Sequence, residues 1–326
     1  MAEPELIEST GDRQCDKVAQ GVIGIFENAF PARVRGFYLR GSHASGTSNA
    51  GSDLDLFIVF KDRFTDLAEY DRAQALCGHC ARLTPMLLEI ILAGESVLRR
   101  TEGIGAALNL KLATRLLYGE DIRPELPPFD ADTYVRSVIH TPYLSYTYPV
   151  QRRNANSLVY PLHHIDRDGP FFGYDQWTMP GPDGIDRPST KLLIASVGWT
   201  ATAIIALRSG QYVRDKAACV ELYQKHVADQ WTDLVAQVHD LCRNHWHYQL
   251  PSGDADRQTL RALCRRALDF QNHFLALYRQ YQLAELASAD ADRQQLAARR
   301  LKQIVFPDQE VADALNDGGL PKHGQA

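Results

Sequence analysis

In the first 130 residues, segments whose apolar residues recur at helical spacing alternate with short apolar runs that are typical of strands. Two stretches carry apolar residues at helical spacing, Asp16–Ala29, ended by Pro31, and Asp66–Leu83. Three apolar runs are typical of strands: Gly36–Arg40, Asp53–Phe60 and Met86–Ala93. Val97–Tyr118 is interpreted as a further helix. This alternation predicts a small mixed α/β sheet flanked by helices.

The second half of the chain is predicted to be mostly helical. Its helical patterns cover Lys191–Leu207, Asp215–His226, Gln230–His245, Asp256–Tyr281 and Ala284–Gln303. The proline-rich stretch Arg123–Phe129 marks a boundary. We therefore expect an α/β domain at 1–128, a long connecting segment at 129–190 without helical periodicity over Tyr143–Thr190, and an α-helical bundle domain at 191–326.

Composition limits the classes of protein and the compartment. The 326 residues are 45% hydrophobic and 23% charged, with a net charge of −5, which is typical of a soluble protein. Lys191–Leu207 is apolar but too short to cross a bilayer, so we expect a buried core helix. The six cysteines show no disulfide-framework spacing and no signal peptide precedes them, which predicts reduced thiols and a cytoplasmic location. The chain lacks the basic stripe expected for a long nucleic-acid partner.

The segment Gly41–Leu56 carries the strongest chemical signal. Gly41 and Ser42 open a Gly/Ser-rich loop after an apolar run, and glycine lets backbone N–H groups approach a phosphate. Asp53 and Asp55 follow at the start of the next strand, where residues two apart project to the same face. Adjacent carboxylates are stable beside hard cations such as Mg²⁺. The same pattern also occurs at the polar edge of any half-buried strand.

A third carboxylate favours the functional interpretation. Glu89 lies in the run Met86–Leu92, which is too apolar for a surface strand, and an isolated buried charge is costly. Metal coordination, or a role as a base beside the metal, would remove that cost. The structural alternative is an ion pair between Glu89 and a nearby arginine such as Arg40.

The glycine–serine pair, the Asp-x-Asp strand and the later acidic residue resemble the DNA polymerase β superfamily of nucleotidyltransferases. Within it, the chain is similar to aminoglycoside adenylyltransferases of the streptomycin/spectinomycin type, through Leu116–Glu120, through Leu126-Pro127-Pro128, and through Arg208–Val213 with Lys216–Ala218. The family usually has Ser-Lys-Asp where this chain has Arg214-Asp215-Lys216, and Tyr143–Thr190 has no counterpart.

This resemblance implies transfer of AMP from ATP to a hydroxyl of a small acceptor, in the manner of an aminoglycoside-modifying enzyme. Two Mg²⁺ ions would be held by Asp53, Asp55 and Glu89, with Glu89 completing a ligand set or accepting the hydroxyl proton. Nucleotide-binding residues would be Gly41 and Ser42, supported by Arg40, Ser52 and Lys216.

Two alternatives to a small acceptor remain open. One is a toxin-like nucleotidyltransferase that modifies tRNA or a protein side chain; the other is a non-catalytic module that senses nucleotides. The Tyr143–Thr190 segment supplies polar and aromatic side chains that would line an acceptor site or pack between domains: Tyr160, His163, Asp166, Phe171, Phe172, Tyr174 and Trp177.

Overall fold

The computed structural model describes residues 4–49, 51–84, 86–100, 104–128, 130–151, 158–180 and 185–317. By their contacts these residues form two compact units. The N-terminal unit comprises Met1–Val138, Thr178–Arg187 and Ser209–Leu222; the C-terminal unit comprises Ile139–Trp177, Pro188–Arg208 and Tyr223–Ala326. Each unit is thus built from three separate segments of the chain.

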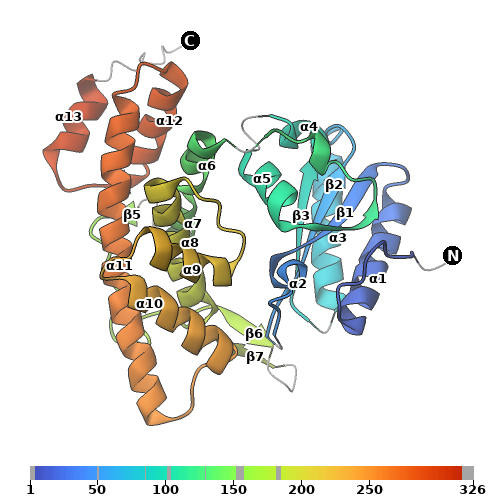
Figure 1. Cartoon of the computed structure of the whole chain (residues 1–326), viewed down its shortest axis with the longest axis horizontal. Coiled ribbons are helices and arrows are strands. Elements are labelled where there is room, and N and C mark those ends of the chain that lie inside the picture. The colour runs from blue at the N-terminus through green and yellow to red at the C-terminus, as the bar shows by residue number, and fades with distance from the viewer. Residues whose placement is uncertain are drawn as a thin grey trace. The chain divides into compact units, whose positions relative to one another are not determined.

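A four-stranded mixed sheet forms the centre of the N-terminal unit (Figure 1). Its strands, in the order β3-β2-β1-β4, are β3 Leu88–Gly94, β2 Leu54–Phe60, β1 Val34–Arg40 and β4 Arg115–Gly119. β2 runs antiparallel to β1 and parallel to β3, and β1 runs antiparallel to β4. The predicted small mixed sheet flanked by helices is confirmed.

Helices cover both faces of this sheet, because side chains of a strand alternate between its faces. One face packs against α1 Arg13–Ala29 and α3 Leu67–Leu83 through Phe37, Leu56 and Ile58. The other packs against α4 Glu95–Leu98 and α5 Ile104–Ala113 through residues of the opposite parity, which include Tyr38, Phe57 and Val59. A short 3₁₀ helix, Arg123–Glu125, follows β4.

The helix predicted for Val97–Tyr118 is wrong at both ends. α4 and α5 are separate helices, and Arg115–Gly119 is the edge strand β4. Leu117 on β4 is buried in the core and the strand pairs with β1 over Gly36–Leu39. Pairing with a distant strand decided this conformation, and a five-residue run directly after a helix carries no local signal for it.

The C-terminal unit is largely helical, as predicted. Its elements are α7 Thr141–Gln151, α8 Lys191–Ser209, α10 Thr232–Gln237, the π-helix Val238–His245, α11 Asp254–Leu286, α12 Ala291–Leu301 and α13 Gln309–Asp317, with a two-stranded parallel pair of β5 Leu158–Val159 and β8 Ile304–Val305. α11 extends five residues beyond the predicted Tyr281 and shortens the helix predicted to follow it. α6 Ala131–Val138, most of α9 Lys216–His226, and strands β6 Thr178–Pro180 and β7 Asp186–Pro188, apart from Pro188, fall within the N-terminal unit.

α7 corrects the expectation that helical structure is absent from Tyr143 onward. Its side chains pack inside the unit: the Tyr146 hydroxyl bonds the Thr200 hydroxyl of α8 at 2.5 Å, and Ser145 Oγ donates to the carbonyl of Pro142 at 2.8 Å. Aromatic and hydroxyl residues give no apolar period, so the sequence pattern missed this helix.

α8 has the length and hydropathy of a membrane span, with 61% of its 18-residue window buried inside the protein. Leu193, Ala201 and Ile205 are completely buried in the unit. α8 is therefore an interior helix, as its sequence predicts. All six cysteines are buried thiols outside any disulfide in the described structure, in agreement with the predicted reduced state.

An ion pair joins Arg33, directly before β1, to Glu69 of α3 in the N-terminal unit. Arg33 donates from Nε and Nη2 to the two carboxylate oxygens of Glu69, at 2.8 and 3.0 Å, and the Thr65 backbone N–H donates to Oε2 at 2.6 Å. The Glu69 side chain is 6% exposed. The hydrogen bonds from Arg33 are the main cause that lowers the pKa of Glu69 to about 2.

We predict that Glu69→Gln lowers the free energy of unfolding at pH 7 by about 1.5–3 kcal/mol, the usual contribution of hydrogen bonds to a charged group. Because the folded-state pKa is depressed, the stabilisation is complete above the ordinary value of 4.5 and is lost as the pH falls toward 2. Urea denaturation of both proteins between pH 7 and pH 3 measures this difference. Glu221→Gln, at an exposed position of α9, is the control; a difference independent of pH would contradict the prediction.

Candidate active site

The turn after β1 is built around Gly41. β1 ends at Arg40, and Gly41 opens the short helix α2 Gly41–Ser45 with a φ of +67°. A Cβ atom at Gly41 would lie 2.1 Å from Oδ2 of Asp55, so any other residue would displace that carboxylate. Glycine is therefore required here both by backbone conformation and by the close approach of Asp55.

Arg40, Asp55 and Glu89 lie side by side on three neighbouring strands. Arg40 is the register partner of Asp55 between β1 and β2, and Asp55 is the register partner of Glu89 between β2 and β3. All three share the parity of Tyr38 and Phe57, so they project on the sheet face that packs against α4 and α5. We call these three residues the charged row. Asp53 directly precedes β2 at the same end.

Glu89 is exposed, which corrects the sequence-based argument that its carboxylate is buried. Its side chain is 60% exposed because β3 is an edge strand of the sheet. Arg40 Nη1 lies 3.6 Å from Glu89 Oε1, so the ion pair considered as the structural alternative is present. No desolvation cost thus demands a metal at Glu89, and its case for function depends on its place beside Asp55.

Asp55 is the electrostatically strained member of the row. Burial is the main cause that raises its pKa to about 7, the charges of Glu89 and Asp53 and a hydrogen bond with Glu89 add to it, and the positive charge of Arg40 opposes them. The fold therefore holds three carboxylates closer together than one guanidinium compensates. Additional positive charge would stabilise the ionised form of Asp55.

The carboxylates around the charged row could supply part of the ligands of a metal ion, with the rest coming from water and substrate. Within the described ranges, no three His, Cys, Asp or Glu side chains are arranged to hold a metal ion by themselves. Mg²⁺ in phosphate-transfer sites usually takes one or two carboxylates and completes its shell with water and substrate phosphates. Asp53 and Asp55 fit that requirement, since their carboxylate oxygens are hard donors and both residues lie at the same end of β2.

The supporting residues predicted from the sequence lie in the same unit. Ser52 closes the turn before Asp53: its Oγ donates to Asn49 Oδ1 at 3.1 Å and accepts from the Asn49 N–H at 2.9 Å. Ser42 lies within α2, directly after Gly41. Lys216 begins α9, and the segment Ser209–Leu222 that contains it belongs to the N-terminal unit.

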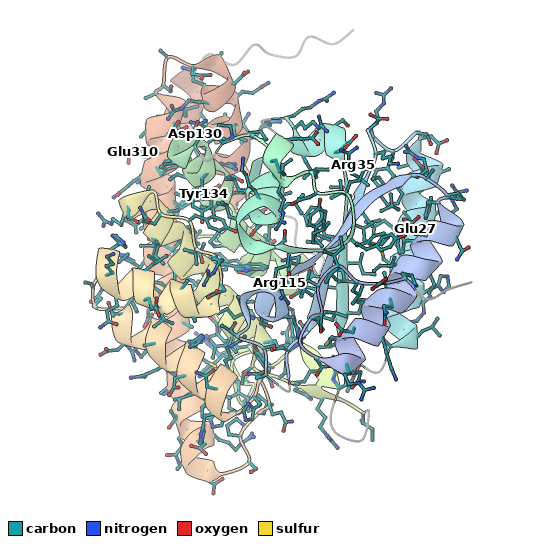
Figure 2. The ribbon with its side chains drawn as sticks, turned by 45° about the vertical axis from the view of Figure 1, so that its right-hand side comes forward. Glu27, Arg35, Arg115, Asp130, Tyr134 and Glu310 are labelled. Atoms are coloured by element: carbon teal, nitrogen blue, oxygen red, sulfur yellow. The ribbon has the colours of Figure 1, made fainter. Side chains whose placement is uncertain are left out.

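Two contacts that the sequence reasoning missed position the site. Arg115 on β4, labelled in Figure 2, donates from Nη2 to the backbone carbonyl of His43 in α2 at 3.3 Å. Tyr212 donates to Asn109 Oδ1 of α5 at 2.9 Å. Burial is the main cause that raises the pKa of its hydroxyl, and the positive charge of Arg40 opposes that rise. Tyr212 could have been identified from the sequence, because it belongs to the segment Arg208–Val213 that carries the family resemblance. Arg115 could not, because its stretch was interpreted as helix.

His43 is buried beneath the turn. Its two ring nitrogens lie 3.8 and 3.9 Å from Cys15 Sγ of α1. Burial is the main cause that lowers its pKa, which favours the neutral imidazole. His43 therefore fixes α2 to α1 as a core residue.

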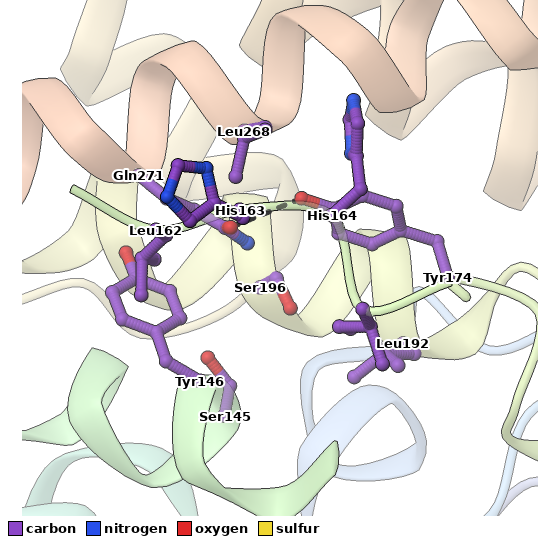
Figure 3. Close-up of a pocket in the computed structure, with 11 residues that line it drawn as sticks. Ser145, Tyr146, Leu162, His163, His164, Tyr174, Leu192, Ser196, Leu268 and Gln271 are labelled. Atoms are coloured by element: carbon purple, nitrogen blue, oxygen red, sulfur yellow. Dashed lines mark hydrogen bonds between the residues drawn. The ribbon is translucent and has the colours of Figure 1, made fainter. Parts of the chain in front are cut away.

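The residues expected to form an acceptor wall divide into two groups. Phe171, Phe172 and Tyr174 are buried within the C-terminal unit, and Tyr174 donates to Gln271 Oε1 at 3.0 Å. His163 lines a cavity of about 50 Å³ together with Tyr174 and Gln271 (Figure 3). This volume suits a few water molecules and is far below the size of a typical ligand site. Packing thus accounts for the three buried aromatic residues, and acceptor binding by Tyr160, His163, Asp166 and Trp177 stays a prediction.

Comparison with known proteins identifies the domain that holds the charged row. Residues 20–97 match the family model of the nucleotidyltransferase domain, and this range contains α2 and strands β1, β2 and β3. A search of curated proteins finds no match. Among solved structures, the chain is similar to spectinomycin adenyltransferase AAD(9) from Enterococcus faecialis, solved with ATP and spectinomycin, with 11% identity, a TM-score of 0.45, and coverage of 78% of this chain and 98% of that one.

We predict that Gly41→Ala is more destabilising than Gly46→Ala. Both glycines have positive φ, +67° and +72°, so both substitutions carry a backbone penalty of about 1–2 kcal/mol. A Cβ at Gly46 has no neighbour within 4 Å, whereas one at Gly41 collides with Asp55. We expect the clash to add about 1–3 kcal/mol, measured by urea denaturation at pH 7. Equal losses in the two variants would show that Asp55 does not pack against Gly41.

Proposed function

We propose that this chain, which contains a nucleotidyltransferase domain, moves AMP from ATP onto a hydroxyl of a small-molecule acceptor. The observation that carries the proposal is the charged row: Asp55 lies against Gly41 and beside Glu89, inside the segment that matches the domain. A phosphate-binding turn and a carboxylate group in direct contact are the components that such a transfer needs.

The turn would bind the triphosphate. Gly41 offers its backbone without a side chain in the way, and Ser42 adds a hydroxyl. Arg40 supplies a guanidinium with five N–H donors, the group best suited to phosphate oxygens. Ser52 and Lys216 would support these contacts. Holding the β- and γ-phosphates here leaves the α-phosphorus facing the acceptor.

Asp53, Asp55 and Glu89 would act on the reacting groups. Asp53 and Asp55 would hold two Mg²⁺ ions, which when bound neutralise phosphate charge and lower the pKa of the acceptor hydroxyl. Glu89, exposed at the edge strand, would complete the ligands or accept the hydroxyl proton. The acceptor oxygen forms a bond to the α-phosphorus, the bond to pyrophosphate breaks, and pyrophosphate leaves.

The acceptor we propose is a cationic, hydroxyl-rich molecule of the aminoglycoside kind. The sequence resemblance to aminoglycoside adenylyltransferases supports this class. Residues 1–128 carry 18 acidic and 14 basic side chains, and an acidic domain attracts a cationic substrate. An enzyme of this specificity would confer antibiotic resistance.

We predict that Asp53→Ala and Asp55→Ala each lower kcat by at least about 10²–10³-fold, because each removes a ligand of the Mg²⁺ that would neutralise charge at the transferring phosphate. Pyrophosphate release from ATP with Mg²⁺ and acceptor measures the loss, and circular dichroism verifies the fold. Asp71→Ala, at an exposed position of α3, is the matched control. Unchanged turnover in either site variant would contradict the assignment of that aspartate.

Incubation with ATP labelled at the α-phosphorus, Mg²⁺ and a cell extract identifies the acceptor. We expect the label in a small molecule, and in streptomycin or spectinomycin when either is added. Label in tRNA or in protein would show that the acceptor is a macromolecule and would contradict the proposed small-molecule acceptor. ATP binding with no pyrophosphate release for any acceptor would favour a nucleotide sensor and contradict the enzyme.

A further inference from the structure

Arg40 occupies the position where a cation would be expected. It is in register with Asp55, and its Nη1 reaches across β2 to lie 3.6 Å from Glu89 Oε1. Arg40 is thus the counter-charge that the fold itself supplies to Asp55 and Glu89.

One nitrogen of the Arg40 guanidinium is unsatisfied in this position, while the side chain as a whole is 28% exposed. Nη1 is shielded from solvent and has no hydrogen-bond acceptor among the described residues, because the ion pair with Glu89 exceeds hydrogen-bonding distance. Elsewhere in the unit, Arg33 donates hydrogen bonds to Glu69 and to two backbone carbonyls. A buried charged donor without an acceptor is costly, and a phosphate oxygen would satisfy it.

Glu89 can change partners at little cost. Its side chain is 60% exposed, and solvent-exposed ion pairs contribute little to stability. Asp55, by contrast, is held by the sheet register and by its contact with Gly41. The interaction in the charged row that can break at little cost is therefore the ion pair between Arg40 and Glu89.

We propose that Arg40 is the resident counter-ion of the charged row and leaves Glu89 when the metal and triphosphate bind, so that the two ligands bind cooperatively. This inference rests on the proposed function. A divalent cation and the guanidinium compete for the same carboxylates, whereas the triphosphate withdraws Arg40 from that competition. Metal alone thus binds weakly, triphosphate strengthens metal binding, and the coupling is reciprocal.

The first test measures binding of Mn²⁺ alone to the metal-free protein by electron paramagnetic resonance. Arg40→Gln removes the competing charge, and we expect Mn²⁺ to bind about tenfold more tightly, within the usual range of coupling between sites. Arg40→Lys keeps the charge and stays within about twofold of the unmodified protein, which also guards against a folding defect in the glutamine variant.

Arg99→Gln is the matched control. Arg99 also forms an ion pair with a glutamate, 2.6 Å from Glu125 Oε2, so its loss changes the net charge equally. Arg99 follows α4, which begins after Gly94, and Gly94 at the far end of β3 lies about 17 Å from Glu89 along the strand. Mn²⁺ affinity should be unchanged in this variant.

The second test adds an ATP analogue with a methylene group between the α- and β-phosphorus atoms, which cannot be cleaved there. In the unmodified protein the analogue should tighten Mn²⁺ binding about tenfold or more, and in Arg40→Gln this coupling should be lost. Equal or weaker Mn²⁺ binding in Arg40→Gln, with coupling retained, would overturn the role of Arg40. Absence of both Mn²⁺ and analogue binding in the unmodified protein would instead refute the proposed function.

Discussion

The crowding of carboxylates at one end of a four-stranded sheet is the constraint on which the N-terminal unit depends. Asp55 is held against Gly41 and beside Glu89 by register, and burial raises its pKa to about 7. A fold selected for stability alone would place an apolar residue there. Protein sites that work on charged substrates commonly keep such strain, because the substrate complex relieves it.

The alternation of side chains across the sheet explains how the unit maintains this arrangement. Residues of one parity form the core with α1 and α3, and residues of the other parity form a second core with α4 and α5. The charged row has the same parity as the strand residues that pack against α4 and α5, and it follows them at the end of the sheet where the apolar packing stops. Two separate apolar cores therefore fix the strand positions, so that Arg40, Asp55 and Glu89 stay adjacent despite their charges.

The nucleotidyltransferase domain and the general fold were predictable because their signals are local. Gly41, Ser42, Asp53 and Asp55 stand within one short segment, and the helices α1, α3 and α8 show clear apolar periods. The errors occurred where pairing over long distances decided the outcome. β4 was taken for helix because its conformation comes from β1, and α7 was missed because hydroxyl and aromatic residues mask its period.

The sequence by itself determined which residues we propose for phosphate and cation binding, and that Asp53 and Asp55 project to the same face, because backbone periodicity acts between neighbours in the chain. Only the tertiary structure decided how those groups meet. The parallel register of β2 and β3 places Glu89 beside Asp55, and the edge position of β3 exposes Glu89 to solvent. Arg40 on β1 lies in register with Asp55 and forms its ion pair with Glu89. Register and exposure depend on contacts between distant segments, which no local pattern of residues encodes.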